Sequence, residues 1–154
     1  MKGPMTGEHQ ENTDTDLRRA LADLCERHGL VALYAFGSRG EEVAARVTGE
    51  GRAEPDRASD ADIGVLPARG RELGVSTLIE LAQELEDLLS VPRVDLVDLG
   101  RADPFLAANV VRGQRLYAED SYAADEYELY VLRRAGDLAP LERQRMALIL
   151  GEEL

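Results

Sequence analysis

The stretch that decides the fold covers residues 30–38 and has the sequence LVALYAFGS. Residues 30–36 are continuously apolar and rich in strand-forming side chains, which predicts a buried β-strand. Gly37 and Ser38 end this strand abruptly, since a glycine allows the backbone to turn sharply. Residues 41–47 then predict a short helix, so the stretch indicates a strand, a tight turn and a helix in succession.

Two more strands are predicted further along the chain. Residues 60–66 (DADIGVL) alternate between polar and apolar side chains, and residues 94–99 (VDLVDL) follow a leucine-rich amphipathic helix. Asp103 and Pro104 are typical of a helix start, and residues 115–118 predict a short edge strand. This succession predicts an α/β (α+β) domain in which helices pack on a small mixed β-sheet.

The same patterns divide the chain into three parts. Residues 1–12 show no periodic apolar pattern and are expected to form a flexible leader. Residues 13–120 contain the predicted strands and are expected to form the domain, with a polar loop at residues 48–59. Residues 121–154 predict a helical C-terminal tail, in which Pro140 is expected to interrupt the helix.

Length and charge narrow the possible functions. The chain has 154 residues, enough for one domain with a real core. Its 18 Lys and Arg against 30 Asp and Glu give a formal net charge of −12. This balance argues against binding to nucleic acid phosphates or to an anionic membrane, and it suits divalent cations or a basic protein partner. The simpler alternative is that the acidic surface only keeps the protein soluble.

Targeting and redox features indicate a cytoplasmic protein. No apolar run approaches the length of about 20 residues that a membrane span needs, and no hydrophobic signal segment is present. Cys25 is the single cysteine, so no internal disulfide can form, and no cysteine or histidine set has zinc spacing.

Three aspartates are candidate metal ligands. Asp60 and Asp62 are two residues apart in a predicted strand, so their side chains share one face with Cα atoms about 6.5 Å apart. If the strand containing Asp95 lies beside them, three carboxylates converge, and a divalent cation such as Mg²⁺ would offset their repulsion. Asp98 is three residues from Asp95 and should face the other side. The alternative is that these carboxylates are merely solvated at strand ends.

The Gly37-Ser38 turn is a candidate phosphate site. A glycine lets the backbone approach a ligand closely, and the helix that follows offers free N–H groups and a positive dipole end. Ser38 could hydrogen-bond a phosphate or cap the helix, and both roles can coexist. Arg39 could add a charged contact.

The segments AFGSRG, SDADIGV and VDLVDL resemble the nucleotidyltransferase superfamily of the DNA polymerase β-like kind, in particular its minimal (MNT-domain) members. The resemblance covers residues 30–120 and implies a nucleotidyltransferase fold. It implies catalytic and metal-binding roles for Asp60, Asp62 and Asp95, and nucleotide-binding roles for Gly37, Ser38 and Arg39. The 21 residues at positions 39–59 exceed the usual interval of the family, which leaves the role of Arg39 open.

The resemblance also implies a reaction and a partner. MNT proteins are similar to antitoxins paired with HEPN-type ribonuclease toxins. The expected activity is transfer of AMP from ATP, with two Mg²⁺ ions, to a hydroxyl (a tyrosine) of the toxin. Residues 121–154 are too few to build a second binding domain, so a minimal module of this kind would take its acceptor from the partner. Two alternatives stay open: a small-molecule (aminoglycoside-type) nucleotidyltransferase, and an antitoxin that neutralises its toxin by binding alone.

Overall fold

The computed structural model describes residues 6–48 and 60–151, with side chains from residue 16 onward. The expected loop at residues 48–59 therefore lies outside the described residues, apart from Thr48, which is the last residue of a helix.

A four-stranded mixed sheet forms the centre of the protein, as the sequence predicted. Its strands are β1 (Leu30–Phe36), β2 (Ala61–Pro67), β3 (Val94–Asp98) and β4 (Gln114–Ala118), in the order β3-β2-β1-β4. β1 pairs antiparallel with both β2 and β4, whereas β2 and β3 are parallel. The order places β4 at one edge, which confirms the predicted edge strand.

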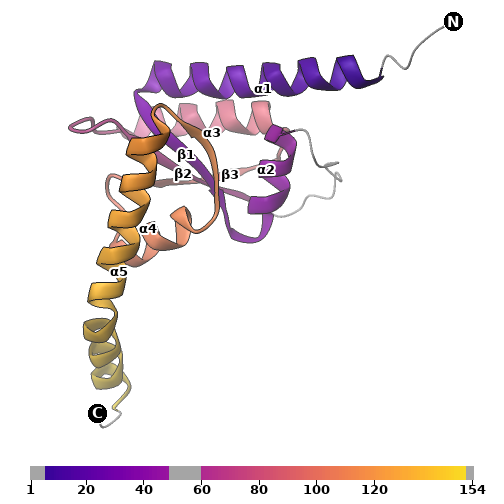
Figure 1. The fold of residues 1–154 in the computed structure, drawn as a ribbon. Helices are drawn as coiled ribbons and strands as arrows, with labels where there is room; N and C mark the ends of the chain where they lie inside the picture. Colours follow the sequence, from indigo (N-terminus) through magenta and orange to yellow (C-terminus); the bar gives the residue numbers. More distant parts are fainter. Residues whose placement is uncertain (1–5, 49–59, 152–154) are drawn as a thin grey trace, which may run out of the picture.

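Helices cover both faces of the sheet (Figure 1). On one face, α1 (Thr6–His28), α2 (Gly40–Thr48) and α3 (Val75–Leu89) enclose a core that includes Leu33, Ile63 and Leu81. On the other face, α4 (Pro104–Val111) and α5 (Ser121–Leu150) enclose a core that includes Tyr34, Val110 and Val131. Alternating side chains of β1 therefore pack into two different cores, which explains why its sequence is continuously apolar.

Helix α4 packs closely on the sheet at Gly64. Asp103 caps the helix by accepting hydrogen bonds from the backbone N–H groups of Phe105 and Leu106, both at 2.9 Å, as the sequence predicted. Against β2, a Cβ atom placed on Gly64 would overlap the Cγ1 atom of Val110. Gly64 is therefore the residue that allows α4 to approach the strand.

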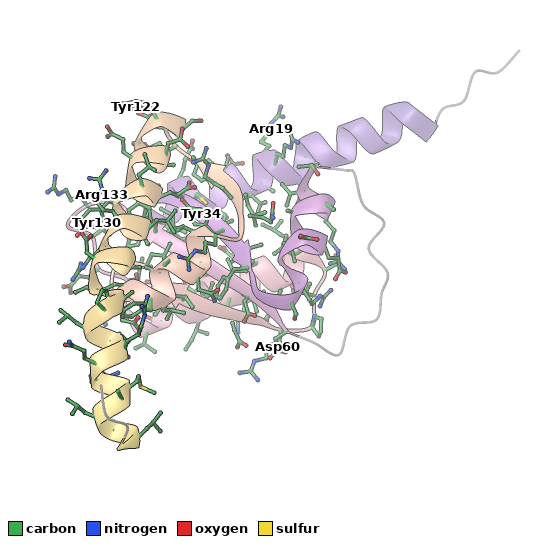
Figure 2. The ribbon with its side chains drawn as sticks, turned by 60° about the horizontal axis from the view of Figure 1, so that its bottom comes forward. Arg19, Tyr34, Asp60, Tyr122, Tyr130 and Arg133 are labelled. Carbon is green, nitrogen blue, oxygen red and sulfur yellow. The ribbon has the colours of Figure 1, made fainter. Side chains whose placement is uncertain are left out.

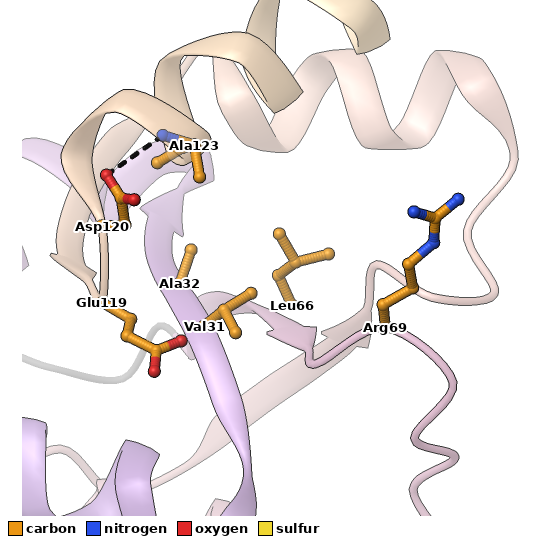
Figure 3. Close-up of a pocket in the computed structure, with 8 residues that line it drawn as sticks. Val31, Ala32, Leu66, Arg69, Glu119, Asp120 and Ala123 are labelled. Atoms are coloured by element: carbon orange, nitrogen blue, oxygen red, sulfur yellow. Dashed lines mark hydrogen bonds between the residues drawn. The ribbon is translucent and has the colours of Figure 1, made fainter.

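The first half of α5 is held by polar contacts. Asp120 caps the helix by accepting from the N–H of Tyr122 at 3.0 Å and of Ala123 at 3.3 Å, the latter drawn in Figure 3. The buried hydroxyl of Tyr34 donates to Glu128 Oε2 at 3.0 Å. Arg115 of β4 donates to the same carboxylate at 2.6 Å. These contacts tie α5 to β1 and β4.

The expected break at Pro140 is wrong, because α5 is one helix from Ser121 to Leu150 with Pro140 inside it. A helical proline removes one hydrogen bond, here the bond to the carbonyl of Gly136. Both residues are exposed, so water can solvate that carbonyl. The flanking residues are mostly strong helix formers, which favours continuation through the proline.

Helix α1 also begins earlier than expected, at Thr6 rather than near Thr13. Residues such as Glu8, Gln10 and Glu11 are good helix formers even without an apolar pattern, which explains the longer helix. The expected flexible leader at residues 1–12 therefore overlaps a helix, and residues 1–5 lie outside the described part. The division into a domain at 13–120 and a tail at 121–154 stays a prediction.

None of the helices in the described part of the chain is long and apolar enough to cross a membrane.

Candidate active site

The pairing of β2 with β3 brings the predicted aspartates to the end of the sheet where these two strands begin, which we call the aspartate edge. In this parallel pair Asp62 is directly opposite Asp95, so their side chains leave the same face on neighbouring strands. Asp62 is also paired with Phe36, whose side chain belongs to the core under α4 and α5. Asp60 immediately precedes β2, and Figure 2 shows it at the lower edge of the body, far from Tyr122 and Tyr130 on α5.

Electrostatic coupling supports this proximity. The pKa of Asp62 is raised above its ordinary value, first by partial burial and then by the negative charges of Asp95 and Asp60. Each of the other two aspartates is therefore close enough to oppose ionisation of Asp62. A cation at this edge would remove that opposition.

Arg93 is a residue at this edge that the sequence reasoning missed. Its Nε atom lies 3.5 Å from Asp95 Oδ1 and 3.9 Å from Asp60 Oδ2. The side chain is 69% exposed, so these contacts are weak surface ion pairs. Its position two residues before Asp95 indicates that the two side chains lie on the same face, since residues two apart share a face in a strand.

The Gly37-Ser38 turn lies against the aspartates. Gly37 has φ +73°, a left-handed conformation that favours glycine, and a Cβ at this position would meet the Oδ2 atom of Asp62. The glycine thus serves both the turn and the close approach to the carboxylate. Ser38 is exposed, and its hydroxyl has no hydrogen-bond partner among the described residues.

Arg39 does not project into solvent beside this turn. Its side chain is 5% exposed and donates to both carboxylate oxygens of Glu42, each at 3.1 Å. Arg46 donates to Glu42 Oε1 as well, at 3.0 Å. The structure therefore brings Gly37 and Asp62 together, whereas it places the guanidinium of Arg39 in a partly buried ion-pair network at the start of α2.

A polar pocket of about 300 Å³ adjoins the turn. Its lining residues come from the end of β1, the start of α2, the end of α4 and the start of β4: Phe36, Gly37, Gly40, Glu41, Asn109, Arg112, Gly113 and Gln114. The sequence reasoning missed Asn109 and Arg112. No pattern in the sequence places these two residues near Gly37, because only the tertiary structure brings the end of α4 to the end of β1.

A second pocket, of about 220 Å³, lies at the opposite end of β1 and is shown in Figure 3. Apolar side chains such as Val31, Ala32 and Leu66 form much of its wall. Among the residues that the structure describes, the charged groups that line it are Arg69, Glu119 and Asp120, and Asp120 is engaged in capping α5. We therefore place the candidate site at the aspartate edge instead.

The aspartate edge fits a divalent cation by its donor chemistry. Ionised carboxylates only accept, and oxygen donors are the ligands that Mg²⁺ prefers. Among the described residues, no group of three or more His, Cys, Asp or Glu side chains is arranged to hold a metal ion. Asp98 is not part of the edge cluster, because its Oδ1 accepts from the N–H of Gly100 at 2.8 Å and stabilises the turn after β3.

A small mixed sheet covered on both faces by helices, in this strand order, is the fold of a nucleotidyltransferase domain. The sequence comparison agrees, since the model of the polymerase beta nucleotidyltransferase family matches residues 19–122. That match spans more than half of the chain, and the chain belongs to this family. A comparison with curated proteins found no significant match.

Solved structures show the same fold. A chain of a toxin–antitoxin complex with AMP-PNP has a TM-score of 0.65 and 24% identity, covering 86% of this chain and 98% of that one. A chain from the complex of a tri-AMPylated Shewanella oneidensis HEPN toxin with its MNT antitoxin has a TM-score of 0.62 and 24% identity, covering 92% and 98%. A chain of the MntA-HepT toxin–antitoxin pair has a TM-score of 0.62 and 22% identity, covering 88% and 98%.

Proposed function

We propose that this protein is an MNT antitoxin that transfers AMP from ATP to a tyrosine hydroxyl of a cognate HEPN-type ribonuclease toxin, and so neutralises it. The observation that carries the proposal is the register of β2 and β3, which sets Asp62 opposite Asp95 beside Gly37. The similar structures support the partner and the donor, because they are complexes with a HEPN toxin or with AMP-PNP.

Each residue of the site has a distinct proposed role. Asp60, Asp62 and Asp95 would hold two Mg²⁺ ions, which when bound neutralise the triphosphate and lower the pKa of the acceptor hydroxyl. The backbone at Gly37 and the hydroxyl of Ser38 would bind phosphate oxygens, since both are open to solvent. Arg39 is better explained as a support for α2, because Glu42 engages its guanidinium.

The proposed transfer is a single displacement of pyrophosphate at the α-phosphorus of ATP. The tyrosine oxygen forms a bond with the α-phosphorus of ATP, and the bond between that phosphorus and the bridging oxygen to the β-phosphate breaks. Pyrophosphate leaves, and the proton of the hydroxyl would go to Asp95, which lies near the start of β3 opposite Asp62. The acidic surface of the antitoxin, with its net charge of −12, would attract a basic RNA-cleaving partner.

A labelling experiment tests this proposal. The protein is incubated with Mg²⁺, ATP labelled at the α-phosphate and the product of the neighbouring gene, which the proposal expects to be a HEPN protein. We expect label on the HEPN protein, which disappears in the Asp60→Asn/Asp62→Asn variant. Asp98→Asn is the matched control, because that side chain holds a turn and should leave labelling unchanged.

The other outcomes separate the alternatives. A stable complex without label would contradict the transfer reaction and indicate an antitoxin that acts by binding. Neither label nor complex would contradict both roles, and activity on a panel of aminoglycosides would then indicate a small-molecule nucleotidyltransferase.

A further inference from the structure

We infer that the polar pocket beside Gly37 binds the pyrophosphate end of the nucleotide, with Arg112 as its cationic ligand. This inference rests on the proposed function. The nucleotide would then lie across the sheet in a defined direction, with Arg112 as a further binding residue.

The order of the strands gives the direction. Asp95 lies on β3, Asp60 and Asp62 lie just before and on β2, Gly37 directly follows β1, and the pocket adjoins the start of β4. Because neighbouring strands are about 4.8 Å apart, β2 and β4 are separated by roughly 10 Å. A polyphosphate whose α-phosphate lies at the aspartates would therefore extend over Gly37 toward the pocket.

Close packing brings Arg112 into this path. A Cβ on Gly113 would overlap the carbonyl oxygen of Ala35 and lie 2.8 Å from the Cβ of Phe36. Arg112 is thus held beside the end of β1, where it lines the pocket with Asn109. Residues 109 and 112 are three apart at the end of α4, so their side chains share one face of the helix.

Burial and carboxylate contacts distinguish Arg112 from Arg39. Arg112 is exposed, and no carboxylate of the described residues lies within ion-pair distance of it. Arg39 is buried against Glu42. An exposed guanidinium without a carboxylate partner can form two parallel hydrogen bonds with a phosphate. Arg112 therefore supplies the cation at the turn that was expected from Arg39.

Glu41 also lines the pocket and opposes an anion there. Two side chains of opposite charge thus face the same ligand. Their replacement should change the affinity for pyrophosphate in opposite directions, which makes the sign of each effect informative.

The test is isothermal titration calorimetry, which measures the affinity of the full chain for ATP, AMP and inorganic pyrophosphate in the presence of Mg²⁺. We expect Arg112→Ala to weaken the binding of ATP and of pyrophosphate about ten-fold or more, since hydrogen bonds between charged groups are stronger than those between neutral ones. Binding of AMP should change by less than about two-fold. Arg112→Lys should restore part of the loss, because charge remains but the planar fork is gone.

Glu41→Gln should strengthen pyrophosphate binding. Arg133→Ala is the matched control, because that exposed arginine lies on α5 (Figure 2). An Arg112→Ala variant that loses ATP and AMP affinity equally, or that binds pyrophosphate as well as the wild type, would overturn the inference alone. A wild-type protein that binds neither ATP nor AMP would overturn the proposed function and this inference with it.

Discussion

At the scale of single residues, the contact between Gly37 and Asp62 connects the backbone of the turn to the carboxylate cluster. The φ of Gly37 is positive, and the space where a side chain would begin is taken by Asp62 Oδ2. A larger residue at position 37 must therefore strain the backbone and displace the carboxylate at the same time.

We expect Gly37→Ala to lower the free energy of unfolding by about 1–3 kcal/mol, the usual cost of a left-handed conformation without glycine. It should also weaken Mg²⁺-dependent ATP binding, because Asp62 must move. Urea denaturation and calorimetric titration measure the two effects. Gly70→Ala is the matched control: Gly70 has φ +83°, but a Cβ there meets nothing within 4 Å, so stability should fall while ATP binding is retained.

The pH dependence of stability should report the raised pKa of Asp62. A carboxyl whose pKa is higher in the folded than in the unfolded state binds its proton more readily when folded. Its contribution therefore becomes less favourable as the pH rises through the interval from 3.8 to the folded pKa. At neutral pH the ionised Asp62 should destabilise the metal-free protein.

We expect Asp62→Asn to be more stable than the wild type at pH 7 in EDTA, and this advantage to shrink as the pH falls toward 4. Addition of Mg²⁺ should stabilise the wild type and have a smaller effect on the variant, because a ligand stabilises the state that binds it. Urea denaturation at several pH values measures both. A variant that is less stable than the wild type at pH 7 in EDTA would contradict the proposed repulsion.

At the scale of elements, the packing of α4 on β2 holds the helix that ends at Arg112. Gly64 leaves no room for a side chain beneath Val110, which is fully buried. The position of the pocket therefore depends on a contact between a strand residue and a helix residue that are far apart in the sequence.

We expect Gly64→Ala to destabilise the protein by about 1–3 kcal/mol through overpacking. Val110→Ala alone should also destabilise it, because it removes buried methyl groups. The double variant should lose less than the sum of the two, since the smaller side chain makes room for the new Cβ. Urea denaturation of all four proteins measures this coupling, and additive losses would mean that Gly64 and Val110 do not limit the helix position.

At the scale of the whole molecule, the strongest feature is the charge of −12 on 154 residues. Charges of one sign repel each other in the compact state, and at 0.1 M salt this repulsion is largely screened between exposed charges more than about 10 Å apart. The stability of the fold should therefore depend on ionic strength.

We expect the melting temperature at pH 7.5 to rise by a few degrees between about 10 and 150 mM NaCl. The same change of salt at a pH near the isoelectric point of 4.6 should have little effect, because the net charge vanishes there. Scanning calorimetry at the two pH values makes the comparison. Equal salt effects at both would show that ion binding or salting-out, and not self-repulsion, is responsible.

The sequence by itself determined the strands, the cap at Asp103 and the opposite faces of Asp95 and Asp98 on their strand, because these follow from local periodicity and turn chemistry. It also predicted the mixed sheet, and the structure confirms it. The register between β2 and β3 agreed with the expectation that Asp95 lies beside Asp62. The continuation of α5 through Pro140 disagreed with the expected break, since solvation of an exposed carbonyl depends on which side of the helix faces water.

Only the tertiary structure decided the charged surroundings of the site. The partner of Arg39 depends on how the turn enters α2, and the location of Arg112 depends on how closely Gly113 approaches β1. Arg93 likewise gains its contacts from the pairing of two strands. Periodicity predicts which face a side chain takes, because that is a local property of the backbone. Which charge lies opposite it is a property of segments that meet only when the chain is folded.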